Sequence, residues 1–406
     1  MSRVGFIAAA VVALFSQSTQ AFTVGSPGGM AAGATGGGNV SAVYPTTNAE
    51  LVSYLKSKEP QVIVLNKTFD FRGTEGTVTE PGCRPDYTRK CMALNNGFKS
   101  QDVILQGGAL NNTGGCTNGT SVTVTYDKAA LTFLTVTGNK TIRGVGTRGV
   151  LMSKGLWLNG DNIIVQNIHI TELNRHLVWG GDAFYMQGTN GGSVPMQHIW
   201  LDHIKISHIG RQFLTTNAAG VASMTISNSD LDGNTDYSKT CDGHHYWSFI
   251  FYGKHDGVSM VNNYIHSLSG RLPRAGSPDS VIVHIANNYY EDNSYHSMEI
   301  ATGSYVLAEG NYFKHTTKPL YDGDDPDIGN SDYGSIYTES GENLCSQYLG
   351  RSCVANVLES SGRFASMNGT KALEAVKLYP VINGYATQPP QLLTVASNNF
   401  GVGTLE

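Results

Sequence analysis

The feature that most constrains the fold is a short pattern that recurs along the chain beyond its first 160 residues. From residue 160 onward, two or three β-branched or apolar residues precede an Asn or a polar substitute, and an alternating strand follows. Six of these polar residues, taken as equivalent, are separated by 36, 25, 35, 25 and 23 residues: Asn167, His203, Asn228, Asn263, Asn288 and Asn311. A period near 23 residues with loop insertions is typical of a solenoid.

Each repeat would form one coil, and the neighbouring coils would supply its hydrogen-bond partners and part of its core. The recurring Asn suits a bend in which the polar side chain bonds the backbone and stacks on the same residue of the next coil. An antiparallel sandwich with Asn-rich turns is the alternative, but the Asn-Gly signals of hairpins are scarce between the alternating strands. The pattern therefore predicts an all-β chain folded as a parallel β-helix.

The first residues predict a secretory signal. Basic Arg3 is followed by an apolar run over residues 4–15, a polar patch over residues 16–20 and then the small residue Ala21. The run is shorter than the ~20 residues of a membrane span, which disfavours a membrane anchor. We therefore expect cleavage after Ala21, removal of residues 1–21 and a secreted, extracellular protein.

The remaining chain is expected to be one domain over residues 22–406, because no Pro-rich, Ser-rich or charged linker divides it. The formal net charge of -5 is small. Overall charge therefore gives no reason to expect nucleic acid or a membrane as a partner, and we expect a monomer.

Six cysteines in a chain with an export signal predict disulfides: Cys83, Cys91, Cys116, Cys241, Cys345 and Cys353. Their spacing matches no zinc pattern, and spacing alone leaves every pairing open. The chain also carries six Asn-X-Ser/Thr motifs that predict surface glycosylation sites, at Asn39, Asn66, Asn111, Asn118, Asn139 and Asn368.

Four segments carry residues that a packed coil does not need. They cover residues 178–183, 209–212, 241–247 and 268–274 and contain Trp179, Asp182, Arg211, His244, His245, Trp247, Arg271 and Arg274. The steps from Asp182 to Arg211, to His244 and to Arg271 are 29, 33 and 27 residues, about one coil each. Stacked coils would gather them into one cationic, aromatic-lined groove around a single carboxylate, suited to a sugar chain with carboxyl or ester groups.

Each of these residues also has a structural explanation. Asp182 could be a turn residue after two glycines, Arg211 its surface partner, and Arg271 and Arg274 a basic loop. The two tryptophans could belong to the core. Adjacent histidines on a strand point to opposite faces, which makes them poor joint metal ligands. The acidic stretch at 322–327 lacks the bidentate Glu of a calcium loop, so no metal or cofactor is expected.

At these segments the sequence resembles the pectin lyases of the polysaccharide lyase superfamily that also contains the pectate lyases. Residues 178–183, 209–212, 243–247, 269–271 and 305–311 resemble a set of family motifs in order. The resemblance runs from about Thr23 to the last cysteine pair and implies a right-handed parallel β-helix with loop insertions that form a substrate groove.

By that resemblance Arg271 is the catalytic arginine, and Asp182, Arg211, Arg274, Trp179 and Trp247 bind substrate. Arg211 falls where the calcium-dependent pectate lyases place a ligating aspartate, with Thr215 near a second one, so a cation would replace the metal. The resemblance also implies the disulfides Cys83–Cys116, Cys91–Cys241 and Cys345–Cys353. Unlike some relatives, the segment from Cys83 to Cys116 contains no tryptophan.

The implied activity is β-elimination on methyl-esterified 1,4-linked galacturonan, with pectin as the partner. The base takes the proton α to the carboxyl carbon, and the glycosidic oxygen leaves. A guanidinium is an unusual base because it normally keeps its proton far above neutral pH. Three alternatives remain: a calcium-dependent pectate lyase, a non-catalytic pectin-binding β-helix, and a glycoside hydrolase, for which only Asp182 and Asp242 are obvious carboxylates.

Overall fold

The structure is a computed structural model that describes residues 23–105, 116, 118–276, 280–321, 335–338, 344–364, 369–393, 395, 400–403 and 405. The predicted signal at residues 1–21, the acidic stretch at 322–327 and two glycosylation motifs, Asn111 and Asn368, lie outside the described residues. Among the described residues, no helix has the length and apolar character needed to span a membrane.

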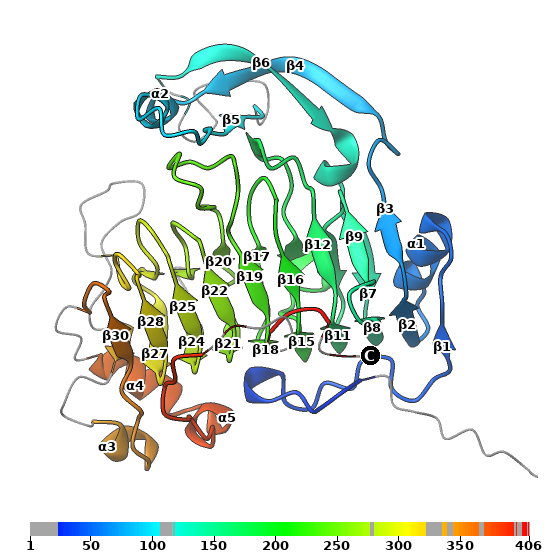
Figure 1. Ribbon diagram of the computed structural model, residues 1–406. Coiled ribbons are helices and arrows are strands. Elements are labelled where there is room, and N and C mark those ends of the chain that lie inside the picture. The colour runs from blue at the N-terminus through cyan, green and yellow to red at the C-terminus, as the bar shows by residue number, and fades with distance from the viewer. Residues whose placement is uncertain are drawn as a thin grey trace, which may run out of the picture.

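Three sheets, parallel throughout, run along the molecule (Figure 1). The ten-stranded sheet contains β1 (Ala42–Val43), β2 (Gln61–Leu65), β8 (Lys140–Gly144), β11 (Ile163–Gln166), β15 (Ile199–Asp202), β18 (Met224–Ser227), β21 (Gly257–Val261), β24 (Val281–Ala286), β27 (Ser304–Glu309) and β29 (Ile336–Thr338). The nine-stranded sheet contains β3 (Thr68–Asp70), β9 (Val150–Met152), β12 (His169–Thr171), β16 (Lys205–Ile206), β19 (Asp230–Asp232), β22 (Tyr264–His266), β25 (Tyr289–Glu291), β28 (Tyr312–Lys314) and β30 (Val357–Glu359). The seven-stranded sheet contains β7 (Leu134–Thr137), β10 (Leu156–Asn159), β14 (Phe184–Met186), β17 (Leu214–Thr216), β20 (Phe249–Phe251), β23 (Arg274–Ala275) and β26 (Glu299–Ile300).

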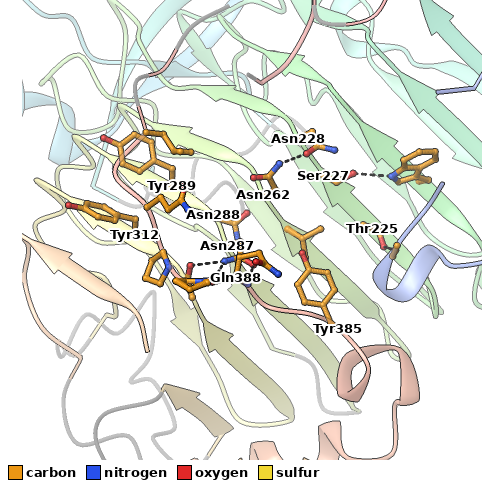
Figure 2. A pocket seen from close by; sticks show the side chains of 18 of the residues that line it. Thr225, Ser227, Asn228, Asn262, Asn287, Asn288, Tyr289, Tyr312, Tyr385 and Gln388 are labelled. Atoms are coloured by element: carbon orange, nitrogen blue, oxygen red, sulfur yellow. Dashed lines mark hydrogen bonds between the residues drawn. The ribbon is translucent and has the colours of Figure 1, made fainter. Parts of the chain in front are cut away.

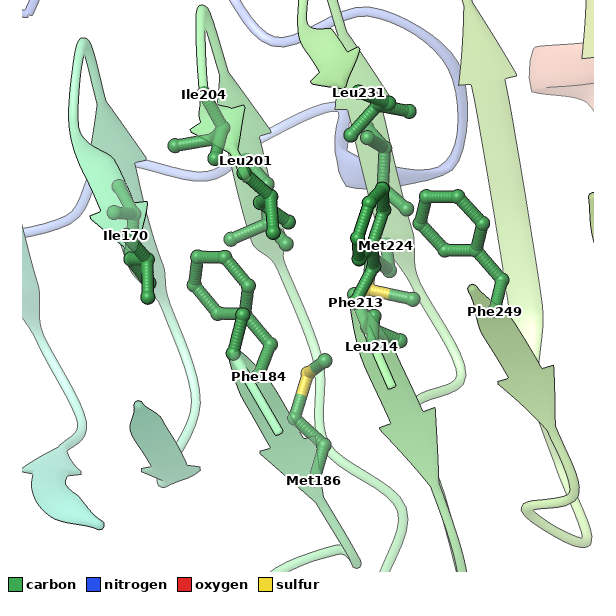
Figure 3. Close-up of a cluster of buried hydrophobic side chains, with 14 of the residues drawn as sticks. Ile170, Phe184, Met186, Leu201, Ile204, Phe213, Leu214, Met224, Leu231 and Phe249 are labelled. Carbon is green, nitrogen blue, oxygen red and sulfur yellow. The ribbon is translucent and has the colours of Figure 1, made fainter. Parts of the chain in front are cut away.

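Each coil visits the ten-stranded, the nine-stranded and the seven-stranded sheet in turn, as β11, β12 and β14 do. Strands of successive coils pair in register, so identical positions stack along the axis. Phe184, Leu214 and Phe249 share one register position, and all three are buried (Figure 3). This architecture confirms the predicted parallel β-helix and rules out the antiparallel sandwich.

The strands of the ten-stranded sheet are buried on both faces because other segments cover its outer side. The 3-10 helix η1 (Gly29–Ala31) crosses this face, where the backbone N–H of Ala31 donates to Thr225 Oγ1 at 2.9 Å. Toward the C-terminal end, α4 (Thr370–Val376) and α5 (Pro380–Asn383) pack over the same sheet. This double coverage explains why the strands read as continuous apolar runs.

The bend after the ten-stranded sheet corrects the predicted repeat. Strand register makes Asn167, His203, Asn228, Asn262, Asn287 and Gly310 equivalent, and each has a positive φ between 50° and 63°. Asn263, Asn288 and Asn311, which the sequence pattern aligned with Asn167, therefore lie one position later. The bend needs a left-handed backbone that Asn and Gly tolerate, and the following residue turns inward.

The inward position forms the predicted asparagine ladder. Nδ2 of Asn263 donates to Oδ1 of Asn288 at 2.9 Å, Asn288 donates to Asn311 at 3.0 Å, and Asn311 donates to Asn356 at 2.9 Å. Backbone N–H groups of the ladder residues donate to the same amide oxygens. The ladder satisfies polar groups at the edge of the core, where unpaired ones would be costly.

A fourth sheet lies over one side of the coils, and we call it the cover (Figure 1). It consists of the antiparallel pair β4 (Thr77–Arg84) and β6 (Thr120–Asp127), joined through β5 (Asp102–Val103) to β13 (Leu177–Val178) of the coils, and it carries α2 (Asp86–Met92). Helix α1 (Asn48–Lys56) packs Leu51 and Leu55 against the first coils, and α3 (Cys345–Leu349) lies near the C-terminal end.

The cysteines pair as the resemblance implies, as Cys83–Cys116, Cys91–Cys241 and Cys345–Cys353. The second bond joins α2 of the cover to the loop before β20. The cover is therefore covalently attached to one of the segments that the sequence analysis assigned to the groove.

Acid should destabilise the protein through Glu309. This buried carboxylate at the end of β27 accepts hydrogen bonds from Arg351 and His284, and these partners bring its pKa down to about 2 in spite of its burial, from 4.5 in the unfolded chain. The carboxylate therefore contributes about 3 kcal/mol above pH 4.5, and this contribution is lost as the pH falls toward 2. Urea unfolding at several pH values should show a weaker acid dependence in Glu309→Gln than in wild type. Equal dependence in both, or the same weakening in the exposed control Glu374→Gln, would contradict this assignment.

Candidate active site

The candidate site lies under the cover, where the chain enters strands of the seven-stranded sheet. Trp179 and Asp182 precede β14, Arg211 precedes β17, Trp247 precedes β20 and Arg271 precedes β23. Because these four strands are neighbours in the sheet, the segments before them also stack. Trp179 and Arg271 have φ values of 67° and 63°, a left-handed conformation that is uncommon for large side chains and is often found at functional sites.

Asp182 and Arg211 form the first half of the site. Asp182 Oδ1 accepts from the backbone N–H of Gln212 at 2.8 Å, and Oδ2 lies 3.4 Å from Arg211 Nη1. The guanidinium of Arg211 stacks on Trp179, with Cζ 3.4 Å from the ring centroid. Asp182 is therefore more than a turn residue, and Arg211 is its ion-pair partner, with exposed side-chain fractions of 12% and 19%.

Burial dominates the electrostatics of this pair. Burial raises the pKa of Asp182. The charge of Arg211, the backbone N–H of Gln212 and the charge of Arg271 act in the opposite direction and lower it. Burial also lowers the pKa of Arg211. The charge of Arg271 lowers this pKa further, whereas the charge of Asp182 raises it. One carboxylate thus faces two guanidinium groups in a poorly hydrated site, where charge interactions are strong.

Arg271 and Trp247 form the second half. The Arg271 Cζ lies 4.7 Å from the Trp247 ring centroid. With its carboxamide oriented to satisfy both neighbours, Gln212 accepts from Arg271 Nη1 at 2.8 Å and donates to the Ser248 carbonyl at 3.3 Å. Arg271 Nε is buried and has no hydrogen-bond partner among the described residues. Gln212 therefore links the two halves, with its backbone on Asp182 and its side chain on Arg271.

His245 links the segments that carry Arg211 and Trp247. Its Nε2 lies 2.7 Å from the carbonyl oxygens of both Arg211 and Trp247, and its ring stacks on Phe213 at 5.2 Å between centroids. Burial lowers the pKa of His245 to about 4, so the ring is neutral and Nε2–H donates to both carbonyls. His244 instead contacts Asp242, so the two histidines do not converge on one ligand. The described residues contain no group of three or more His, Cys, Asp or Glu side chains suited to a metal ion.

Arg274 occupies a different place from the other predicted residues. It lies on β23, where Nη1 is 3.2 Å from Glu299 Oε2 in the next strand and Cζ is 5.7 Å from the Tyr252 ring. The structure thus brings five of the predicted residues together: Trp179, Asp182, Arg211, Trp247 and Arg271. The side chain of Arg274 instead pairs with Glu299 of the next coil.

Three further residues approach this site that the sequence motifs did not identify. Lys239 Nζ lies 4.0 Å from the Tyr246 ring centroid and 5.5 Å from that of Trp247, and 5.4 Å from Tyr87 of the cover. Gln101, also from the cover, accepts from Trp247 Nε1 at 2.8 Å. Lys239 stands two residues before Cys241, so its position beside the third of the four segments, residues 241–247, was a usable signal. No sequence signal identified Tyr87 and Gln101, because the sequence does not show where the cover packs on the coils.

Comparison with known proteins identifies the family of the chain. The pectate lyase family model matches residues 88–389. The chain is 42% identical over 359 residues to a probable pectin lyase D of Aspergillus flavus, covering 87% of this chain and 88% of that protein. It is 41% identical over 363 residues to pectin lyase B of Emericella nidulans, with coverages of 87% and 88%.

Solved structures support the fold. A pectate lyase from Paenibacillus sp. 0602 has a TM-score of 0.52 at 15% identity, covering 94% of this chain and 96% of that one. A second pectate lyase, studied for its substrate specificity and anti β-elimination mechanism, has a TM-score of 0.51 at 18% identity, with coverages of 96% and 100%. Because the family model spans most of the chain and the curated relatives exceed 40% identity over nearly nine-tenths of it, this protein belongs to the pectate lyase family.

Proposed function

We propose that the protein is a pectin lyase, which cleaves methyl-esterified 1,4-linked galacturonan by β-elimination and leaves unsaturated uronate ends. The observation that carries the proposal is the single carboxylate Asp182 set between the guanidinium groups of Arg211 and Arg271, with Trp179 and Trp247 against them. Curated relatives that carry the name pectin lyase support the same activity.

In the proposed reaction Arg271 first gives up one guanidinium proton to solvent and then, as the neutral guanidine, takes the proton from C5 of a galacturonosyl residue. The electrons of that C–H bond form the double bond between C4 and C5, and the glycosidic oxygen on C4 leaves and takes up a proton from solvent. Negative charge develops on the ester carbonyl as the proton departs. Arg211 is placed to stabilise that charge, because a guanidinium fixed by Asp182 and Trp179 needs little reorganisation.

The remaining predicted residues have binding roles in this proposal. Trp179 and Trp247 provide aromatic faces for sugar rings, and Arg274 would contact the chain one coil farther along the groove. Lys239, beside Trp247, adds a cation at the edge of the same surface. Pectin is the proposed partner.

The donor set of the site does not suit calcium, which prefers six to eight oxygen ligands. Asp182 supplies one carboxylate, and the Arg211 guanidinium occupies the adjacent space at 3.4 Å. Thr215 on β17 offers only a buried hydroxyl. We therefore favour a reaction without calcium over that of a calcium-dependent pectate lyase.

A hydrolytic mechanism is disfavoured by the state of Asp242, the second candidate carboxylate. Its oxygens accept from Thr240 Oγ1 and Ser294 Oγ, each at 2.6 Å. These bonds and His244 bring its pKa down to about 2 although burial raises it. A general acid of a hydrolase needs a raised pKa, so Asp242 is better explained as a loop anchor.

We further propose that the protein acts outside the cell as a monomer. Three disulfides suit an oxidising compartment, in line with the predicted signal. Exposed Asn39, Asn66 and Asn118 would be available as glycosylation sites.

Substrate preference tests the proposed function. The value of kcat/KM should be at least about tenfold higher for methyl-esterified oligogalacturonides than for de-esterified ones of equal length, because the enolate that develops from an ester carries less negative charge than the one that develops from a carboxylate. The ester also makes the C5 proton more acidic. Steady-state rates on the two sets give the ratio, and a preference for the de-esterified set would contradict the proposal.

A further inference from the structure

A second elongated pocket lies on another side of the β-helix, at the bend between the ten-stranded and nine-stranded sheets (Figure 2). Its volume is about 530 Å³, and residues 385–393 form one wall. The other wall extends from Trp200 on β15 to Tyr312 on β28 and so crosses five coils. None of the candidate active-site residues lines it.

The lining is uncharged and rich in groups that bind sugars. It consists of amide, hydroxyl, aromatic and small apolar side chains, without a charged one among the described residues that line it. Tyrosine rings offer flat apolar faces for sugar C–H groups, and carboxamides offer both donors and acceptors for hydroxyls. Such a lining suits an uncharged sugar chain, whereas the site around Asp182 and Arg211 suits carboxyl derivatives.

The amides in this pocket repeat with the coils. Strand register places Asn228, Asn262 and Asn287 at one equivalent position, with φ values of 51°, 55° and 56°. Neighbouring strands are ~4.8 Å apart, so five coils span about 19 Å, the length of several linked sugar rings. Asp202 holds the amide of Asn228 and Gln388 holds that of Asn287, so the row forms a regular surface along which a linear polymer can lie, with Asn262 as its exposed amide.

Hydrogen bonds fix the wall formed by residues 385–393, and the opposite wall keeps an amide oxygen that can accept a hydrogen bond from a ligand. Asn287 Nδ2 donates to the Gln388 carbonyl at 2.6 Å, and its Oδ1 accepts from the Gln388 N–H at 3.0 Å, which holds the C-terminal segment in place. Asn262 is exposed; its Nδ2 donates to Asn228 Oδ1, and its own Oδ1 accepts no hydrogen bond from the described residues. The partly exposed ring of Tyr385 faces the same pocket.

From this pocket we infer a second glycan-binding site, which takes a strand of uncharged pyranose residues and is independent of the catalytic groove. Neutral polysaccharides and fully methyl-esterified galacturonan share this chemistry. Binding here would hold the enzyme on its polymeric substrate while the catalytic groove acts on another stretch.

Calorimetric titration tests the site with two probes. Neutral β-1,4-linked galacto-oligosaccharides are titrated into wild type, and methyl-esterified oligogalacturonides into Arg271→Ala, so that no cleavage occurs. Binding of at least one probe should weaken by about fivefold in Tyr385→Ala, which removes a ring, and in Asn262→Gly, which removes an amide at a bend that glycine tolerates. For the esterified probe, each pocket substitution is combined with Arg271→Ala and compared with the Arg271→Ala protein.

Matched controls replace exposed residues of the same type outside the pocket: Tyr44→Ala, and Asn190→Gly at a φ of 49°. These controls should bind like their parent protein, and all four single variants should keep the wild-type kcat on a short esterified substrate. The inference is overturned if neither probe binds, if the pocket variants bind both probes as tightly as the controls do, or if de-esterified oligogalacturonides bind the pocket equally well. If the wild-type protein showed no elimination activity, only the proposed function would be refuted, because binding of the neutral probe does not depend on that activity.

Discussion

Replacing Arg271 by lysine is expected to lower kcat by about 10³-fold, a loss in the range of a missing general base. The contact of Nη1 with Gln212 and the position of Cζ over Trp247 both require the planar guanidinium, and an ammonium on a flexible stem reproduces neither. Initial rates from the ultraviolet absorbance of the products, on esterified pectin, measure the effect. Arg271→Ala should lose at least as much.

The fold should survive this change. Lys has the same left-handed backbone cost as Arg at a φ of 63°, and Arg271 contributes little packing to the core. The thermal transition should therefore stay within a few degrees of wild type. Exposed Arg148→Lys is the matched control and should keep full activity. Near-normal turnover of Arg271→Lys would refute the catalytic assignment.

Replacing Arg211 by alanine is expected to lower kcat/KM by about 10²-fold, comparable to removal of one oxyanion-stabilising donor. The change leaves Asp182 buried without its nearest cation and removes the group that stacks on Trp179. The pKa of Asp182, already raised by burial, should rise further, so the carboxyl group takes up a proton more readily. Rates measured over a range of pH should show this as a new dependence that wild type lacks.

A lysine at position 211 keeps the charge but loses the stacking and the fixed geometry, so Arg211→Lys should fall between alanine and wild type. Arg72→Ala removes an exposed arginine that pairs with Asp70 far from the site and serves as the control. Equal activity of Arg211→Ala and the control would show that Arg211 is only a structural partner of Asp182.

Sequence reasoning predicted the features that depend on periodicity. The repeat gave the parallel coils, and motifs spaced one coil apart placed Asp182, Arg211 and Arg271 together, because strands that pair in register stack the segments before them. The disulfides followed from the resemblance and could not be derived from spacing.

Other features depend on the path of the backbone, which residue types report poorly. Tandem asparagines such as Asn262-Asn263 hid which one occupies the left-handed bend, so the alignment slipped by one position. The same ambiguity did not arise at Asn167, where one asparagine stands alone. The contacts of Gln101 and Tyr87 depend on how the cover docks, and the pocket lined by Tyr385 depends on the return of the C-terminal segment; neither leaves a local pattern.

The central claim is elimination without a bound metal, and product absorbance under chelation tests it most directly. Wild-type protein treated exhaustively with chelator and supplied with methyl-esterified pectin should produce the ultraviolet absorbance of a conjugated double bond at an undiminished rate. Added calcium should not increase that rate, because the Arg211 guanidinium stands beside the Asp182 carboxylate. Loss of the absorbance on chelation with recovery on added calcium, or reducing ends that appear without any absorbance, would contradict the account.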